Sequence, residues 1–309
     1  MIQTIVSKLI DTIPKKIKTN FEFNPLIIDI VLEGGAFNGS YLAGCLFYLK
    51  ELEERNYIKI NRLSACSVGT IISLVYFINN EILMTKIYEL SYNQFKKKAD
   101  INIFKKAFQI IKTYITPEIF DSINNRLYIS YFNVDSGKQK VVCKYKDIDH
   151  LLDIIRRSCS FPYIIDKNLY YKNKYVDGMY PYIFSIDEKN IQNKHILYLN
   201  LHSIHHVTGL MSVKNEPNNI KRVVDGVIST HNFFVYKKNT DICSFVDEWS
   251  VKEYFTHYLF TIYLSVFIYV LHKIYILENI LRKKFKINKI SLINIINYFY
   301  NWIIKQYCI

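Results

Sequence analysis

Residues 25–77 constrain the fold more than any other part of the sequence. An apolar run rich in β-branched residues, Pro25 to Leu32, ends at a pair of glycines and is followed by a helical pattern from about 41 to 55. Residues 58–65 have the composition of a second strand, and residues 68–77 that of a buried helix. Apolar runs bounded by proline and glycine are typical of buried parallel strands, and strands that alternate with helices build α/β sheets. The sequence therefore predicts an α/β domain with a mainly parallel central sheet.

Further helices and strands are predicted toward the C-terminus. Thr116 and Pro117 are the residue types preferred at a helix N-cap and at the first helical position. The turn residues 135–137 separate two apolar runs in the manner of a β-hairpin. The predicted helices are 82–115 and 149–157, and the predicted strands are 127–134, 138–145, 170–176 and 196–201.

We divide the 309 residues into three parts. Residues 1–25 are an N-terminal amphipathic segment, because Lys8 and Asp11 interrupt its apolar positions and argue against a secretory signal. Residues 26–250 hold the α/β domain, and residues 251–309 form a helical, apolar and basic C-terminal appendage. A disordered or low-complexity chain is excluded, because half of the residues are apolar.

The C-terminal appendage contains a stretch, 254–272, without any Asp, Glu, Lys or Arg. As a helix it would reach about 28 Å, close to the thickness of a bilayer core. A basic stretch, 282–289, and a second apolar segment, 290–304, follow it. Placing the basic stretch in the cytosol would push the α/β domain across the membrane, so we expect helices that dock on the domain or lie in the interface. An ordinary core helix is the alternative for 254–272.

The formal net charge is +13, and residues 251–309 carry +6 of it. This excess favours an anionic membrane surface as partner over nucleic acid, because the sequence holds no nucleic-acid-binding motif. A lysine excess that reflects codon bias is the alternative. The six cysteines are scattered and form no CxxC pair, which argues against a zinc site or a disulfide framework and indicates a reducing, cytoplasmic compartment.

The chain has only nine glycines, about half the usual share, and three sites collect five of them. The first site is Glu33-Gly34-Gly35-Ala36-Phe37-Asn38-Gly39, between a predicted strand and a predicted helix. Backbone N–H groups that converge before a helix N-terminus suit an oxyanion or a phosphate. The sequence has neither the GK[ST] of a P-loop nor the GxGxxG spacing of a dinucleotide site.

The second site is Ala65-Cys66-Ser67-Val68-Gly69, between the next strand and helix. It has the nucleophile-elbow pattern G-x-S-x-G, with alanine at the first glycine position. Such a turn presents the serine hydroxyl at a helix N-terminus and needs small residues where the strand and helix backbones nearly touch. A serine that only caps a helix is the alternative.

The third site is Asp177-Gly178, which follows a predicted strand. A carboxylate at a strand end can serve as a general base. Asp-Gly is also a common turn dipeptide, so this site by itself does not indicate chemistry.

Taken together and in this order, the three sites resemble the patatin-like phospholipase family. Its members carry a glycine-rich oxyanion loop, a G-x-S-x-G motif roughly thirty residues later and an Asp-Gly motif more than about a hundred residues beyond. Here 33 positions separate Gly34 from Ser67, and 110 separate Ser67 from Asp177. Residues 157–162 resemble the turn that precedes the aspartate in that family. The resemblance covers about residues 26–235. The amino-acid usage of the chain suggests a divergent member of the family, such as those of large DNA viruses.

The resemblance implies a three-layer α/β/α fold and a lipid acyl hydrolase of phospholipase A type without a cofactor. It implies a dyad in which Asp177 takes the proton of Ser67, which attacks an ester carbonyl and forms an acyl-enzyme. It also implies a membrane lipid substrate, action at a cytoplasmic membrane surface (in a host cell if the chain is viral) and room for an unidentified activator. The implied oxyanion donors are the N–H groups of Gly34, Gly35 and Ala36, and the implied supporting residues are Ala65, Gly69, Gly39 and Gly178.

Three residues depart from the family pattern. Asn38 stands where arginine or lysine is usual, Ala65 replaces a glycine, and Met179 replaces the Gly or Ala after Asp-Gly. A catalytically inactive, membrane-associated interaction protein of the same type is therefore the alternative function. A soluble thioesterase or small-ester hydrolase is a third.

Three histidines follow the predicted strand 196–201, at His202, His205 and His206. Closely spaced histidines can bind a metal ion, but no acidic or cysteine partner lies near them in the sequence. A Ser-His-Asp triad that uses one of them is the sharper alternative to the dyad. The sequence alone leaves it open.

Overall fold

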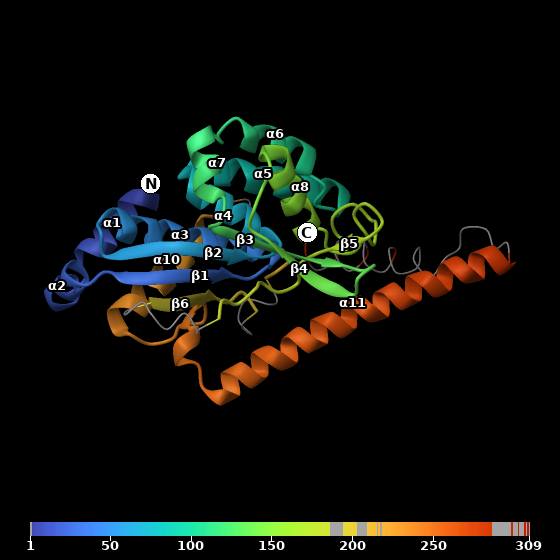
Figure 1. Ribbon diagram of the computed structural model, residues 1–309. Coiled ribbons are helices and arrows are strands. Elements are labelled where there is room, and N and C mark those ends of the chain that lie inside the picture. Colours follow the sequence, from blue (N-terminus) through green and yellow to red (C-terminus); the bar gives the residue numbers. More distant parts are fainter. Residues whose placement is uncertain are drawn as a thin grey trace.

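The computed structural model describes residues 2–185, 194–202, 209–214, 216, 218–285, 298, 302, 306 and 308. Within these residues the chain forms one seven-stranded sheet in the order β4-β3-β2-β1-β6-β7, and β5 pairs with β3 (Figure 1). The strands are β1 (Leu26–Leu32), β2 (Ile58–Ala65), β3 (Leu127–Asn133), β4 (Lys138–Val142), β5 (Tyr175–Val176), β6 (Lys194–Leu199) and β7 (Cys243–Phe245).

The centre of the sheet is parallel. Strand β1 pairs in parallel with β2 on one side and with β6 on the other, and β2 pairs in parallel with β3. Strands β4 and β7 add antiparallel edges, and β5 pairs antiparallel with β3. The predicted α/β class with a mainly parallel central sheet is confirmed.

Helices flank the sheet, and the two short 3-10 turns η1 (Ala36–Asn38) and η2 (Val246–Glu248) follow β1 and β7. Thr116 caps α7, because its side chain accepts a hydrogen bond from the Ile119 N–H, and Pro117 is the first helical residue, as predicted. The helices are α1 (Ile2–Asp11), α2 (Lys15–Phe23), α3 (Gly39–Glu54), α4 (Val68–Ile78), α5 (Glu81–Lys98), α6 (Phe104–Lys112), α7 (Pro117–Ile123), α8 (Ile148–Ser158), α10 (Ile220–Tyr236) and α11 (Val251–Phe285).

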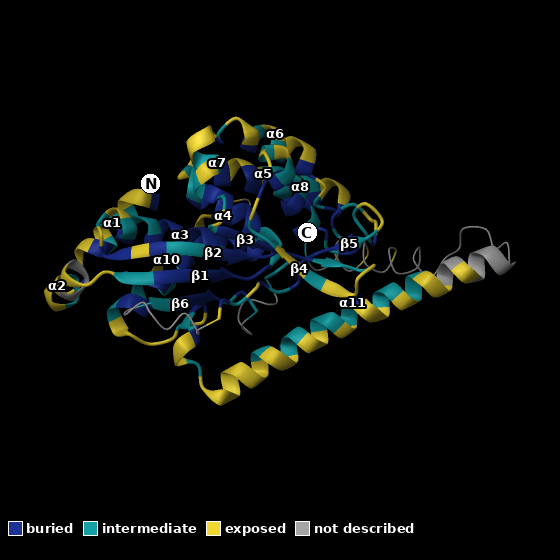
Figure 2. Cartoon of the chain, viewed as in Figure 1, coloured by how far each residue is buried: buried dark blue, intermediate teal, exposed yellow. Residues whose placement is uncertain are grey.

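The core lies on both faces of β1, which is why this strand carries no exposed residue (Figure 2). Ile28 and Ile30 belong to the main core with apolar residues of α3, α4 and α10. Val31 points to the opposite face and packs with Tyr198 and Val246. Residues of α11 extend this second layer, since the His257 ring lies 5.4 Å from the ring of Tyr198.

Several predicted elements differ from the structure. The predicted helix 82–115 is divided into α5 and α6, because Ala99 takes a left-handed conformation that ends α5. Of the predicted strand 170–176 only β5 is a strand, and the second hairpin strand ends at Val142. The N-terminal segment forms two helices, and α1 buries Ile2, Val6 and Ile10 in the main core. Helix α10 had no sequence prediction.

Helix α11 is the longest helix of the described chain and crosses the side of the molecule opposite α5 to α8 (Figure 1). By length and composition, residues 251–277 are apolar enough to cross a membrane, and only 6% of the most apolar part is buried. This exposure contradicts the core-helix alternative for 254–272, because a core helix buries most of its side chains. The second apolar segment, 290–304, lies outside the described residues apart from Tyr298 and Trp302.

Candidate active site

Ser67 lies on a sharp turn between β2 and α4. Its backbone has φ 50° and ψ −131°, a conformation that a non-glycine residue adopts only at a cost of about 1–3 kcal/mol. The turn is close to the glycine loop, because a Cβ on Gly69 would lie 2.8 Å from the Glu33 carbonyl oxygen and a Cβ on Gly34 2.8 Å from the Ser67 Cβ. Ala65 fits the first elbow position as a fully buried residue of β2. This is the local geometry of a nucleophile elbow.

Ser158, the last residue of α8, connects this turn to the sheet. The Ser67 N–H donates to Ser158 Oγ over 3.0 Å, and Ser158 Oγ donates to the carbonyl oxygen of Ser130 over 2.6 Å. The neighbouring Cys159 thiol and the Thr70 hydroxyl both donate to the Ser67 carbonyl oxygen. The sequence predicted the 157–162 turn but gave Ser158 no role, because its two partners lie 91 and 28 positions away.

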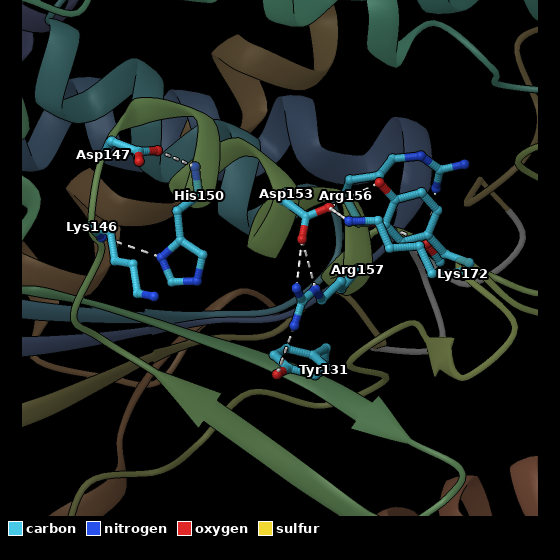
Figure 3. A network of polar contacts seen from close by, with 10 residues as sticks. Tyr131, Lys146, Asp147, His150, Asp153, Arg156, Arg157 and Lys172 are labelled. Atoms are coloured by element: carbon cyan, nitrogen blue, oxygen red, sulfur yellow. Dashed lines mark hydrogen bonds and ion pairs between the residues drawn. The ribbon is translucent and has the colours of Figure 1, made fainter.

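A polar network holds the end of α8 in place (Figure 3). Arg157 donates two hydrogen bonds to Asp153 Oδ2, one of them 2.6 Å long, and a third to the Tyr131 hydroxyl. Lys172 Nζ lies 2.7 Å from Asp153 Oδ1. Burial raises the pKa of Asp153, but the hydrogen bonds from Lys172 and Arg157 outweigh burial and lower it overall.

The glycine loop offers two backbone donors next to Ser67. The Gly35 and Ala36 N–H groups have no hydrogen-bond partner among the residues that the structure describes. The Gly34 N–H instead contacts the buried Cys66 thiol, whose pKa burial raises. Ala36 has φ 44°, so the loop holds a strained residue directly after Gly35. Of the three predicted oxyanion donors, two therefore have no partner within the described part of the chain.

Asp177 is 2% exposed and lies at the end of β5. Its Oδ1 accepts the Met179 N–H over 2.9 Å, while its Oδ2 is buried without a hydrogen-bond partner among the described residues. Burial raises the pKa of Asp177 to about 7, although the Met179 N–H and the nearby Ser67 hydroxyl both lower it. Among the described residues, no cation forms an ion pair with this carboxyl group.

Ser67 and Asp177 line one cavity of about 230 Å³, together with Gly34, Gly35, Ala36 and Gly39. The rest of the wall is mostly apolar and comes from α4, α5, α6 and the segment after α8. Helix α11 contributes Leu264, and the segment after Asp177 contributes Met179. Residues that are far apart in the sequence thus meet in a mostly apolar pocket, in which Asp177 is the one carboxyl group among the described lining residues.

His202 also lines this cavity, but its polar contacts lead elsewhere. Its backbone N–H donates to Glu33 Oε2, and its Nε2 lies 3.8 Å from the same oxygen. Among the described residues, no hydrogen bond or ion pair joins His202 to Ser67 or Asp177, as a triad through His202 would require. His205 and His206 lie outside the described residues. Within the described part of the chain, no group of three or more His, Cys, Asp and Glu side chains is arranged to hold a metal ion.

At the position of Asn38, a charged side chain from another element contacts the glycine loop. Asn38 is fully buried, and its Oδ1 accepts a hydrogen bond of 2.7 Å from Arg222 of α10. Arg222 is 3% exposed and also donates to Glu216 and to the carbonyl oxygens of Gly209 and Ser212. A buried guanidinium thus contacts the glycine loop at Asn38, the position where the sequence lacks the positive charge of the family pattern.

The departure at Met179 has a packing reason. Met179 has φ 59°, so it sits in the left-handed conformation that glycine adopts most easily. Its side chain is buried with Val176 and with Ile268 of α11. Met179 therefore joins the Asp177 segment to the C-terminal helix.

Comparison with family models and with curated proteins found no match. Two solved structures are similar in part. The crystal structure of VipD from Legionella pneumophila is 12% identical over 56% of this chain and 49% of that chain, with a TM-score of 0.29. The second is ExoU, from the structure of the heterodimeric ExoU-SpcU complex of the type III secretion system of Pseudomonas aeruginosa. It is 13% identical over 69% of this chain and 52% of that chain, with a TM-score of 0.38. The chain spans about half the length of these two.

Proposed function

We propose that the protein is a lipid acyl hydrolase of phospholipase A type, related to the patatin-like phospholipases, with Ser67 as nucleophile and Asp177 as general base. The observation that carries the proposal is the cavity shared by a strained serine and a buried carboxyl group that has no cationic partner among the described residues. A buried carboxyl with a pKa near 7 is suited to accept a proton at neutral pH, because general bases work best near the ambient pH.

The chemistry runs in two steps. Asp177 takes the proton of Ser67 as the serine oxygen attacks the ester carbonyl, and the alcohol leaves with a proton from Asp177. Water then attacks the acyl-serine with Asp177 again as base, and Asp177 returns this proton to the Ser67 oxygen as the fatty acid leaves. The Gly35 and Ala36 N–H groups donate to the oxyanion in both steps, and each such donor contributes about 10²–10³ in rate.

The cavity supports an acyl chain as the bound group. Its lining includes aliphatic and aromatic side chains from α4, α5 and α6, such as Ile71, Ile87 and Phe104. Apolar walls favour a hydrocarbon chain and offer nothing to a charged head group. The substrate is therefore a membrane lipid, met at an anionic membrane surface of the cytoplasm, and an unidentified activator remains part of the proposal.

Ester hydrolysis and active-site labelling test the proposal. We expect the wild type to cleave a phospholipid in mixed micelles and to react with a fluorophosphonate probe, and Ser67→Ala to do neither. Ser136→Ala is the matched control, because Ser136 lies in the exposed turn between β3 and β4. Folded wild-type protein that neither cleaves esters nor binds the probe would favour the inactive interaction protein instead.

A further inference from the structure

Helix α11 presents a long apolar face to solvent. Between Tyr254 and His272 it has no charged residue. Tyr258, Tyr263, Val266 and Tyr269 are each more than half exposed, and Leu259, Ile262 and Val270 more than 40%. An exposed apolar surface of this extent marks an interaction site in a soluble domain.

The opposite face of α11 is docked on the domain. The Tyr170 hydroxyl and His272 Nδ1 are 2.6 Å apart, and the Tyr180 hydroxyl and Ser265 Oγ are 3.3 Å apart. Ile268 is 3% exposed. These contacts hold α11 against the α/β domain along its docked face, which favours a helix that lies along a surface over one that crosses a bilayer.

The composition of the free face identifies its partner as a lipid surface. Tyrosine prefers the membrane interface, where its ring is buried and its hydroxyl stays near water. The same helix continues into Arg282-Lys283-Lys284, and residues 251–309 carry a net charge of +6. Basic residues next to an apolar helix face favour anionic head groups.

The docked face reaches the candidate active site. Leu264 lines the cavity, and the Phe260 ring lies 5.1 Å from the ring of His202. Ile268 belongs to one buried apolar cluster with Val176 and Met179, and the Met179 N–H donates to Asp177 Oδ1 over 2.9 Å. One helix thus carries the exposed apolar face on one side and part of the cavity wall on the other.

We propose that α11 lies in the plane of an anionic lipid surface and couples that surface to the cavity, with Leu264 as a wall of the acyl-chain site and Ile268 as the support of the Asp177 segment. The coupling rests on the proposed hydrolase function, whereas the lipid-surface assignment does not. Ile268 is a positioning residue, because it acts through Met179.

Vesicle binding tests the lipid-surface assignment without any need for activity. The full chain is sedimented with vesicles of phosphatidylcholine alone or with added phosphatidylserine. We expect binding that needs phosphatidylserine. Val266→Glu should weaken this binding about tenfold or more, because an apolar side chain buried in lipid is replaced by a charged one. Ile82→Glu, at an equally exposed position of α5, leaves binding unchanged. Unaltered binding of Val266→Glu overturns the assignment, as does a wild type that dimerises and ignores vesicles.

A soluble short-chain ester tests the coupling. Ile268→Ala is expected to lower kcat several-fold and to move the acid limb of the pH profile, because the support of the Asp177 segment is lost. Leu259→Ala, on the free face of the same helix, leaves both unchanged. An Ile268→Ala profile that keeps the wild-type midpoint overturns the coupling. If the wild type cleaves no ester, the proposed function and the coupling fail, and the vesicle result still decides the lipid-surface assignment.

Discussion

Replacing Asp177 by asparagine is expected to stabilise the folded protein at neutral and alkaline pH. Asp177 is 2% exposed, and its Oδ2 has no hydrogen-bond partner among the described residues. Burial raises its pKa from 3.8 to about 7. Above pH 7 the folded protein must therefore hold a charged, unpaired carboxylate, which the unfolded chain exposes to water.

The magnitude follows from the two pKa values. A difference between 3.8 and about 7, at about 1.4 kcal/mol per pH unit, corresponds to about 4 kcal/mol. Because the folded pKa is the higher one, folding takes up a proton between these values, and stability from this group is lost as the pH rises from about 4 to 7. Asparagine is neutral at every pH, so Asp177→Asn removes this loss.

Urea unfolding of the wild type and of Asp177→Asn at pH 4 and pH 8 measures the effect. We expect nearly equal free energies of unfolding at pH 4 and a variant more stable by up to about 4 kcal/mol at pH 8. Asp153→Asn is the control of opposite sign, because the hydrogen bonds of Lys172 and Arg157 outweigh burial and lower the pKa of Asp153. An Asp177→Asn variant that is no more stable than the wild type at pH 8 would refute the reasoning.

Three further predictions follow from the same geometry. The hydrolysis rate of a soluble ester should fall about tenfold per pH unit below a midpoint near pH 7, because Asp177 must be ionised to act as base; a pH-independent rate between 5 and 8 would contradict this. Gly178→Ala should lower the free energy of unfolding in urea by about 2 kcal/mol or more, because the new Cβ would lie 2.3 Å from a backbone oxygen of β3. Gly137→Ala should lower it by only about 1 kcal/mol, because the space around Gly137 is open. Arg222→Met should lower the free energy of unfolding by about 3 kcal/mol and also lower kcat, because the buried guanidinium holds Asn38 of the glycine loop; an unchanged kcat would restrict its role to stability.

The three glycine-containing sites could be recognised in the sequence, because each of them needs small residues at fixed positions of a local turn. Parallel strands of one sheet end at the same edge, so a glycine loop after β1 and an elbow after β2 had to lie near each other. Helix α10 escaped prediction because its buried face includes Arg222, Gly226 and Thr230, which blur an apolar periodicity. The same helix supplies the charge behind the glycine loop.

The sequence by itself determined the α/β class, the elbow at Ser67 and the loop that precedes it, because strand periodicity and close backbone approach leave local signatures. Only the tertiary structure decided the properties of Asp177, since a dipeptide common in turns becomes a buried carboxyl group with a raised pKa through burial among distant segments. It also decided which N–H groups are free and that Ser158 holds the elbow. In the sequence Met179 departs from the family pattern, whereas in the folded chain its side chain is buried in one cluster with Ile268 of α11. The sequence could not show this packing, because α11 is distant from Met179 along the chain.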